Sequence, residues 1–376
     1  MSNTQTKNVP ELRFPGFEGE WEEKKLGDLI KVNSGKDYKH LEKGDIPVYG
    51  TGGYMTSVSE PLSEIDAVGI GRKGTINKPY LLEAPFWTVD TLFYCTPKKE
   101  TDILFILSLF RKINWKVYDE STGVPSLSKQ TINKINRFVP SNKEQQKIGE
   151  FFIKLDRQIE LEEQKLELLQ QQKKGYMQKI FSQELRFKDE NSEDYPHWEN
   201  SKIEKYLKER NERSDKGQML SVTINSGIIK FSELDRKDNS SKDKSNYKVV
   251  RKNDIAYNSM RMWQGASGRS NYNGIVSPAY TVLYPTQNTS SLFIGYKFKT
   301  HRMIHKFKIN SQGLTSDTWN LKYKQLKNIN IDIPVLEEQE KIGDFFKKMD
   351  ILISKQKIKI EILEKEKQSF LQKMFL

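Results

Sequence analysis

Glu144-Gln145-Gln146-Lys147-Ile148-Gly149-Glu150-Phe151-Phe152 is followed much later in the chain by Glu338-Gln339-Glu340-Lys341-Ile342-Gly343-Asp344-Phe345-Phe346. The similarity continues without an insertion or deletion from residues 127–181 to residues 321–375. Both copies have the pattern of a long helix, whereas the segments between them share almost no similarity. A duplicated helix that carries two divergent inserts indicates a protein that recognises two different targets at a fixed separation.

Apolar residues recur in both copies at alternating steps of four and three. In the first copy these positions are Ile148, Phe152, Leu155, Ile159, Glu162, Leu166, Leu169, Lys173, Tyr176 and Ile180. In the second copy they are Ile342, Phe346, Met349, Ile353, Gln356, Ile360, Leu363, Lys367, Phe370 and Met374. The polar exceptions fall in the same two slots of each copy. A heptad stripe this long on a highly charged helix predicts a partner helix, and the other copy has the right length.

An antiparallel pair related by a pseudo-twofold axis is the most economical arrangement, because each helix leads out of its own insert. In this pairing we expect Glu162 to lie opposite Lys367, and Lys173 opposite Gln356, so that each polar interruption meets a compatible one. A helix of about 40 residues is roughly 60 Å long, so the pair would act as a ruler between the inserts.

Both inserts predict short strands and one helix. Each opens with a similar lead-in, which contains Arg13 and Trp21 in the first insert and Arg186 and Trp198 in the second. Segments rich in β-branched residues predict strands at 45–49, 67–70, 88–94, 253–257, 274–276 and 280–284. Apolar spacing predicts helices at 102–115 and 291–307. The fold class is therefore α+β, with domains at 1–140 and 185–334 alternating with long helices at 141–184 and 335–376.

The composition favours a polyanionic partner. The chain has 62 Lys and Arg against 50 Asp and Glu, which gives a net charge of +12. The charges are interspersed, so the excess is a property of the surface rather than of a basic tail.

The same composition makes a cytoplasmic location the expectation. Cys95 is the only cysteine and lies in a predicted strand, which excludes a disulfide framework and a cysteine-rich zinc site. Residues 1–10 are polar and lack the apolar run of a signal peptide, and no apolar run is long enough to cross a membrane.

A glycine-rich stretch in the first insert carries candidate DNA contacts. Gly69, Gly71 and Gly74 satisfy G-x-G-x-x-G, but β-branched residues and Pro79 follow, where a dinucleotide site would need a helix. We therefore predict a tight turn between strands, with basic side chains that project toward a phosphate or a guanine edge. The candidates are Arg72, Lys73, Thr75 and Lys78; the alternative is a solvated basic turn.

The second insert has its own cluster of candidates. Its residue types suit base edges and backbone phosphates, and they are Asn258, Arg261, Trp263, Gln264 and Arg269. A core position is an equal alternative for Trp263.

Motifs for catalysis are missing from the sequence. There is no Pro-Asp dipeptide of a restriction nuclease core and no phosphate-binding G-x-x-x-x-G-K-[ST] loop. His301 and His305 lie four apart on a predicted helix without the Glu of H-E-x-x-H, so we expect a surface helix face and no metal site. Asn77-Lys78-Pro79-Tyr80 is similar to the Asn-Pro-Pro-Tyr of adenine methyltransferases, but no cofactor-binding motif precedes it.

Together these features resemble the specificity subunit of Type I restriction-modification enzymes. The most specific pieces are Pro334 followed by Leu336-Glu337-Glu338-Gln339, and the Gln-Lys-x-Phe that ends each copy at Gln178–Phe181 and Gln372–Phe375. Segments 68–79 and 86–94 resemble one recurring type of target-recognition domain, and 257–266 and 274–280 resemble another.

The resemblance implies a non-catalytic chain that binds an asymmetric bipartite site in double-stranded DNA. It implies two methyltransferase (modification) subunits and restriction subunits as partners, with S-adenosylmethionine, ATP and Mg on those partners and no cofactor on this chain. Two rivals remain, a stand-alone DNA methyltransferase and a coiled-coil adaptor that binds proteins.

Overall fold

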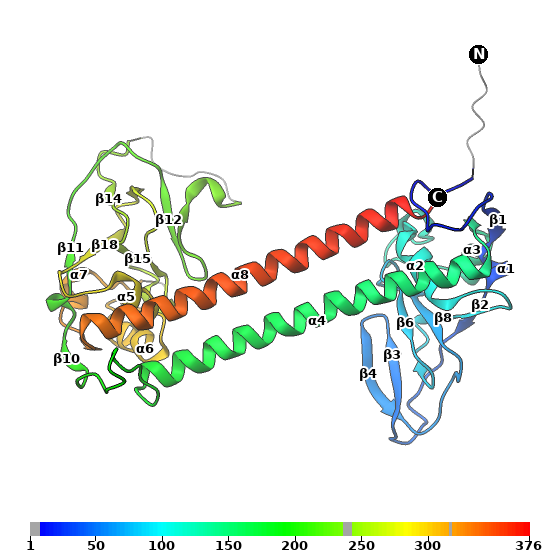
Figure 1. Cartoon of the computed structure of the whole chain (residues 1–376), viewed down its shortest axis with the longest axis horizontal. Helices are drawn as coiled ribbons and strands as arrows, with labels where there is room; N and C mark the ends of the chain where they lie inside the picture. Colours follow the sequence, from blue (N-terminus) through cyan, green and yellow to red (C-terminus); the bar gives the residue numbers. More distant parts are fainter. Residues whose placement is uncertain (1–7, 236–242, 316–317) are drawn as a thin grey trace, which may run out of the picture. The chain divides into compact units, whose positions relative to one another are not determined.

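The computed structural model describes residues 8–235, 243–315 and 318–376, and the chain divides into two compact units. Unit 1 comprises Met1–Lys165 and Gln356–Leu376, and unit 2 comprises Leu166–Lys355. Helices α4 (Asn142–Phe181) and α8 (Leu336–Lys373) each contribute one part to each unit (Figure 1). The two long helices are confirmed, and each unit combines one insert with parts of both.

A four-stranded sheet in the order β2-β8-β5-β6 is the centre of unit 1 (Figure 1). Its strands are β2 (Ile30–Ser34), β8 (Leu92–Pro97), β5 (Ala67–Gly71) and β6 (Tyr80–Leu82). A second sheet joins β4 (Gly53–Val58), β3 (Ile46–Gly50) and β7 (Trp87–Thr88), and β1 (Glu22–Lys25) pairs with β9 (Asn136–Val139). The helices are α1 (Leu26–Leu29), α2 (Ile103–Lys112), the 3-10 turn η1 (Trp115–Tyr118) and α3 (Lys129–Lys134).

Unit 2 has a four-stranded sheet of the same kind, in the order β11-β18-β15-β16. Its strands are β11 (Leu207–Glu209), β18 (Tyr280–Pro285), β15 (Ile255–Asn258) and β16 (Ser267–Arg269). Three strand pairs accompany it: β10 (Glu199–Lys202) with β19 (Asn330–Ile333), β12 (Leu220–Thr223) with β13 (Gly227–Lys230), and β14 (Lys248–Val250) with β17 (Gly274–Val276). The helices are α5 (Ser291–Lys297), α6 (His301–Asn310) and α7 (Tyr323–Leu326), with 3-10 turns η2 (Ile203–Lys205), η3 (Phe231–Glu233) and η4 (Met262–Gln264).

The strand registers show which strands of the two sheets correspond. In unit 1, Gly71 at the end of β5 pairs with Leu92, and in unit 2, Asn258 at the end of β15 pairs with Tyr280. Strand β5 therefore corresponds to β15, and β8 to β18. The repeated stretch then attaches to both sheets in the same way, because Leu127 N donates to Arg72 O at 2.9 Å and Leu321 N donates to Ser259 O at 2.8 Å.

Two predicted elements are divided in the structure. The strand expected at 88–94 is two strands, because Val89 N bonds to Tyr49 O and residues 89–91 turn the chain from β7 into β8. The helix expected at 291–307 is also two, because the side chain of Thr300 caps a new helix, α6, by accepting from Met303 N at 3.4 Å. Cys95 is a buried strand residue, as predicted.

The repeated Glu-Gln pair has the same structural role in both units. Glu144 and Glu338 are buried, and each accepts from the arginine of its lead-in, Arg13 at 2.7 Å and Arg186 at 2.6 Å. The following glutamines, Gln145 and Gln339, each donate to the proline before the helix and accept from the backbone at the N-cap of α2 or α5. The lead-in, the long helix and the domain helix are thereby joined by hydrogen bonds.

The long helices are antiparallel within each unit. In unit 1, Phe151 packs on Phe370 with ring centroids 5.0 Å apart, and further along α4, Glu162 accepts from the Gln356 amide at 2.7 Å. In unit 2, Lys173 donates to Asp350 at 2.5 Å, and Tyr176 packs on Phe345.

The predicted register is wrong. Lys367 forms its ion pair with Asp156 rather than with Glu162, and Lys173 forms its ion pair with Asp350 rather than with Gln356. Glu162 instead meets Gln356, its own counterpart in the repeat, and Lys359. In this register Lys367 exchanges one carboxylate, Glu162, for another, Asp156. Lys173 gains a charged acceptor, Asp350, in place of the neutral Gln356 amide.

Burial along the predicted seam is greatest near the ends of the helices. Ile148, Phe152, Ile342 and Phe346 are at most 2% exposed. Leu155, Ile159, Met349 and Gln356 are also buried, whereas Glu162, Lys173, Ile353 and Lys367 are half-buried. The helices therefore pack most fully where they join the inserts.

A matched pair of glycines tests this junction. A Cβ at Gly149 would lie 2.5 Å from Asp102 Oδ1, the N-cap atom of α2, whereas a Cβ at Gly343 would lie 3.1 Å from its nearest neighbour, a Leu292 side-chain carbon. We expect Gly149→Ala to lower the free energy of unfolding by about 1–3 kcal/mol, and Gly343→Ala by clearly less. Gly175→Ala in α4 has nothing within 4 Å and should raise it by up to about 1 kcal/mol through helix propensity. Urea unfolding of the three variants measures this order, and equal losses for Gly149→Ala and Gly343→Ala would contradict it.

Candidate nucleic-acid interface

The glycine-rich stretch of the first insert is a connection between two strands, as predicted. Strand β5 ends at Gly71 and pairs antiparallel with β6, and residues 72–79 connect them. A Cβ at Gly71 would lie 2.1 Å from Thr75 O, and Gly74 has φ +87°, so the chain needs glycine at both positions to turn back. No helix follows the motif, which excludes a dinucleotide fold here.

Arg72 and Lys73 leave this turn with exposed side chains. The backbone of Arg72 is held on both sides, because its N–H donates to Thr91 O at 2.8 Å and its carbonyl accepts from Leu127 N. Lys78 and Thr75 lie in the same connection, where Lys78 is exposed and Thr75 is half-buried. The structure therefore brings the four predicted residues of the first insert into one loop.

The near-match to a methyltransferase motif has a local structural role. The Tyr80 hydroxyl donates to Gly50 O at 2.5 Å, and burial raises the pKa of Tyr80. This bond ties β6 to the end of β3.

Four predicted residues of the second insert lie in one turn after β15. Met260 N donates to Asn258 Oδ1 at 3.0 Å, the Arg261 guanidinium donates to Gln264 Oε1 at 3.1 Å, and Trp263 Nε1 donates to Met260 O at 3.1 Å. Fully buried Met262 anchors the turn in the core. The turn begins at the place in the sheet that Arg72 has in unit 1, so both inserts present candidate side chains after corresponding strands.

Trp263 is half-buried and is therefore not an ordinary core tryptophan. Its ring meets Trp319 edge to face at 5.3 Å, and the Lys308 ammonium lies 5.9 Å from the Trp319 ring. Sequence reasoning missed Trp319, because it lies in a separate loop 56 positions after Trp263.

Arg269 is not part of this turn. It lies at the other end of the β15–β16 hairpin, where its backbone is opposite Ile255 in the antiparallel strand pair. Its guanidinium donates to Ser291 at 3.1 Å, to Asn271 at 2.9 Å and to Asn253, and burial lowers its pKa. These hydrogen bonds are internal to the domain, so Arg269 supports the base of the hairpin.

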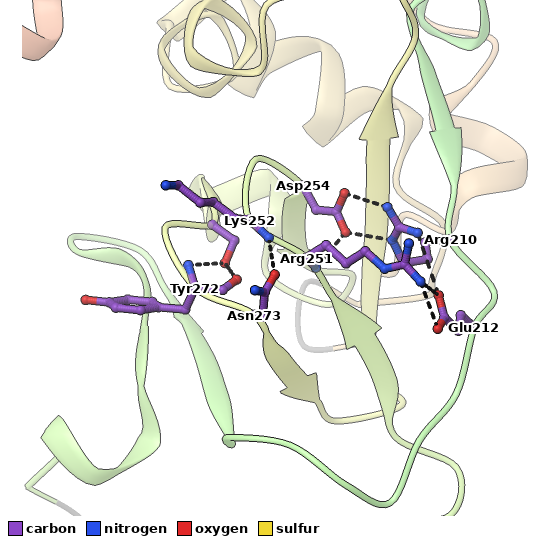
Figure 2. Close-up of polar contacts among 8 residues, drawn as sticks. Arg210, Glu212, Arg251, Lys252, Asp254, Tyr272 and Asn273 are labelled. Atoms are coloured by element: carbon purple, nitrogen blue, oxygen red, sulfur yellow. Dashed lines mark hydrogen bonds and ion pairs between the residues drawn. The ribbon is translucent and has the colours of Figure 1, made fainter.

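The start of β15 is fixed by a second network, which Figure 2 shows. Asp254 is 2% exposed and accepts two hydrogen bonds from Arg210, at 2.7 and 2.9 Å, and one from Arg251 N at 2.8 Å. The Arg251 side chain pairs with Glu212, and Lys252 N donates to Asn273, while the Lys252 ammonium points away (Figure 2). Strand β15 is thus held at its first residues, which fixes the direction in which its last residues enter the turn.

Two lysines of unit 2 are withdrawn from solvent, Lys297 fully and Lys299 in part. Lys299 donates to Ile224 O at 2.8 Å and to Gly265 O at 2.6 Å, so it ties the turn after β15 to the hairpin β12–β13. Lys297 is 2% exposed, and its ammonium lies 4.7 Å from the Trp198 ring and 5.3 Å from the Phe181 ring. Burial lowers the pKa of each lysine to about 8.

The described residues contain no group of three His, Cys, Asp or Glu side chains that could hold a metal ion. His301 and His305 lie on the exposed face of α6, as predicted. Within the same residues, no helix is both long and apolar enough to span a bilayer.

The fold and these turns define a class: a duplicated protein in which two domains, each with a four-stranded sheet of the same strand order, share a pair of long helices. The family model for the Type I restriction modification DNA specificity domain matches residues 18–171 and 178–364. The chain therefore belongs to this family, and its role in DNA specificity agrees with the expectation from sequence.

Solved structures show the same fold. The chain is similar to the S subunit of a Type I restriction-modification system from M. genitalium, with a TM-score of 0.65 at 14% identity over 98% of this chain and 99% of that one. It is also similar to a chain from a study of complex assembly and conformational transition of the type I R-M system, with a TM-score of 0.52 at 14% identity over 94% and 97%. A comparison with curated proteins gave no match. The α+β fold with two recognition domains and two long helices is confirmed.

Lys297 makes the stability of unit 2 depend on pH. Its pKa is about 8 in the folded state against 10.5 for an ordinary lysine, so between these values the unfolded chain binds the extra proton. The free energy of unfolding should therefore rise as pH increases through this window. We expect the gain between pH 7.5 and 9.5 to be smaller in Lys297→Met by on the order of 2 kcal/mol. Urea unfolding at both pH values measures it, with Lys308→Met on α6 as control; an undiminished gain in Lys297→Met would refute the assignment.

Proposed function

We propose that this chain reads the two unlike halves of an asymmetric bipartite DNA site and directs modification and restriction subunits to it. One observation carries the proposal: two sheets of the same strand order present different side chains after corresponding strands. The first domain offers Arg72 and Lys73 there, and the second offers Asn258, Arg261 and Gln264. Two sheets of the same order that carry different side chains suit a protein that recognises two different half-sites on one duplex.

The side chains have the chemistry of base and phosphate recognition. Arginine can bond to O6 and N7 of guanine with two hydrogen bonds, and Asn or Gln can do the same with N6 and N7 of adenine. The Arg261–Gln264 bond holds both side chains in one turn before DNA arrives, which reduces the entropy lost on binding. The net charge of +12 favours approach to a polyanion and predicts affinity that falls with salt.

Exposed apolar residues on the long helices support the binding of partner subunits. In unit 1 the side chains of Leu161, Ile358 and Ile362 are 48–55% exposed. In unit 2 the side chains of Leu168, Ile351 and Leu352 are 45–55% exposed. Apolar side chains repeated along charged helices are typical of a surface that another protein covers. We assign them to the modification subunits, which would carry S-adenosylmethionine, while ATP and Mg would act on the restriction subunits.

The chain itself would contribute binding and positioning rather than a chemical step. The candidate turns contain amide, guanidinium, ammonium, hydroxyl and aromatic groups, all of which can bind bases or phosphates. Base flipping and methyl transfer would then occur on the partner subunits.

Exchange of one domain tests whether each domain recognises its own half of the DNA site. Replacing residues 21–140 with another recognition domain should change one half of the methylated site, because the second domain keeps its own sheet and turn. Methylome sequencing of a host that carries the hybrid and the modification subunits measures both halves. Replacing residues 185–334 is the matched control and should change only the other half. A change in both halves after a single exchange would refute the proposal.

Lengthening the long helices tests their proposed role as a ruler. Helix α4 has 40 residues and α8 has 38, and one added heptad lengthens a helix by about 10 Å. Adding one heptad after Lys165 and one after Lys355 should therefore lengthen the unread spacer by about three base pairs at 3.4 Å each. The methylated sequence reports the spacer directly, and an unchanged spacer in an active variant would exclude the ruler.

A further inference from the structure

A cavity of about 390 Å³ lies beside the turn of the first domain. Strand β2 contributes Ser34 to its wall and β8 contributes Phe93, and the cations around it are Arg72, Lys73 and Lys129. Ser126 adds a hydroxyl group, whereas the Ser128 hydroxyl already donates to Glu120, and none of the residues that line the cavity is acidic. The cavity therefore concentrates positive charge and hydrogen-bond donors.

The cations come from two elements that converge on one ring. Arg72 follows β5 and Lys129 begins α3, yet the guanidinium carbon and the ammonium both lie 6.0 Å from the centre of the Phe93 ring. Phe93 is 3% exposed, so packing holds its ring in place at the bottom of the cavity. Two like charges beside one apolar ring repel each other, and an anion between them would relieve that repulsion.

The cations of this cavity keep their charge available. No ion pair involves Arg72, Lys73 or Lys129 in the part of the chain that the structure describes. The nearby carboxylate of Glu120 accepts hydrogen bonds from Ser128 at 2.8 Å and from Thr131. That carboxylate therefore orders the start of α3 without neutralising Lys129.

The second domain lacks this arrangement at the corresponding place. The strand registers and the repeat align Arg72 with Ser259, Phe93 with Thr281 and Lys129 with Tyr323. Ser259 and Thr281 share a hydrogen bond of 2.9 Å, and the Tyr323 hydroxyl donates to Leu207 O at 2.9 Å. The three hydroxyl groups bond to each other or to the backbone, so these positions of the second domain do not repeat the two cations beside an apolar ring.

We propose that this cavity binds one backbone phosphate of the DNA strand whose bases Arg72 approaches. The proposal rests on the DNA-reading function given above and adds a contact at a place where the second domain carries Ser259 and Tyr323 instead. The Lys129 ammonium and the Ser126 hydroxyl suit phosphate oxygens, and such contacts fix the position of a domain on the duplex without reading sequence. Lys129 is thus a positioning residue, while base recognition stays with the turn after β5.

The salt dependence of DNA binding tests this assignment. The full chain, assembled with its modification subunits, is titrated with a duplex that carries its site at several salt concentrations. Lys129→Gln should reduce the slope of log affinity against log salt by about 0.9, the value for one lost phosphate contact. The preference for the correct bases in both half-sites should stay unchanged. Lys134→Gln changes an exposed lysine of the same short helix outside the cavity and should keep the wild-type slope.

Each other outcome has a separate meaning. An unchanged slope in Lys129→Gln, or an equal change in Lys134→Gln, would overturn the phosphate site, and so would a new base preference in the first half-site. Lys129→Arg should restore the slope, which separates lost charge from misfolding. A cavity that binds inorganic phosphate, seen as a thermal shift lost in Lys129→Gln, with no change in the DNA slope, would show a site for small anions and also overturn it. If wild-type complex binds DNA without sequence preference, the proposed function fails instead.

Discussion

Aromatic packing at the ends of the long helices is the interaction on which both units depend. In unit 1 the Phe375 ring lies 5.5 Å from Phe105, 5.9 Å from Phe152 and 6.2 Å from Trp21. In unit 2 the Phe181 ring has the corresponding neighbours, with Phe293 at 5.6 Å, Phe346 at 5.7 Å and Trp198 at 6.4 Å. Each cluster joins the end of one helix, the start of the other, the lead-in and the domain helix. Its loss would leave four elements without a common core.

The same clusters explain why the heptad pattern gave the right pairing and the wrong register. Heptad slots repeat every seven residues, so sliding one helix by a heptad keeps apolar positions opposite apolar positions. Among these registers, the polar slots favour the one that places Glu162 opposite Lys367. Buried aromatic rings at the ends involve larger areas than one half-buried ion pair, and they decided the outcome. The sequence does place Phe181 and Phe375 at the ends, but two of the three ring partners of each lie in inserts whose fold it does not specify.

Much of the architecture could be predicted because it is encoded locally or by the repeat. The long helices, most strands and the glycine turn follow from periodicity and from backbone requirements at Gly71 and Gly74. The sheet order could not be predicted, because it depends on contacts between distant strands. Lys129 and Trp319 were missed as candidate contacts for the same reason, since each approaches its turn only through the fold. Arg269 was grouped with Arg261 because it is near in sequence, yet the hairpin places it at the opposite end of β16.

The two domains show how one frame can support different specificities. The positions that repeat in both units are internal: the Glu-Gln pair, the glycine at the helix junction and the aromatic clusters. The positions that differ, such as Arg72 and Ser259 or Lys129 and Tyr323, occur where the repeated stretch attaches to the sheet. Changes at sites that share no partners usually have additive effects on free energy. Side chains in one turn can therefore change without altering the frame, because the backbone bonds from Leu127 and Leu321 do not depend on which side chain the turn carries.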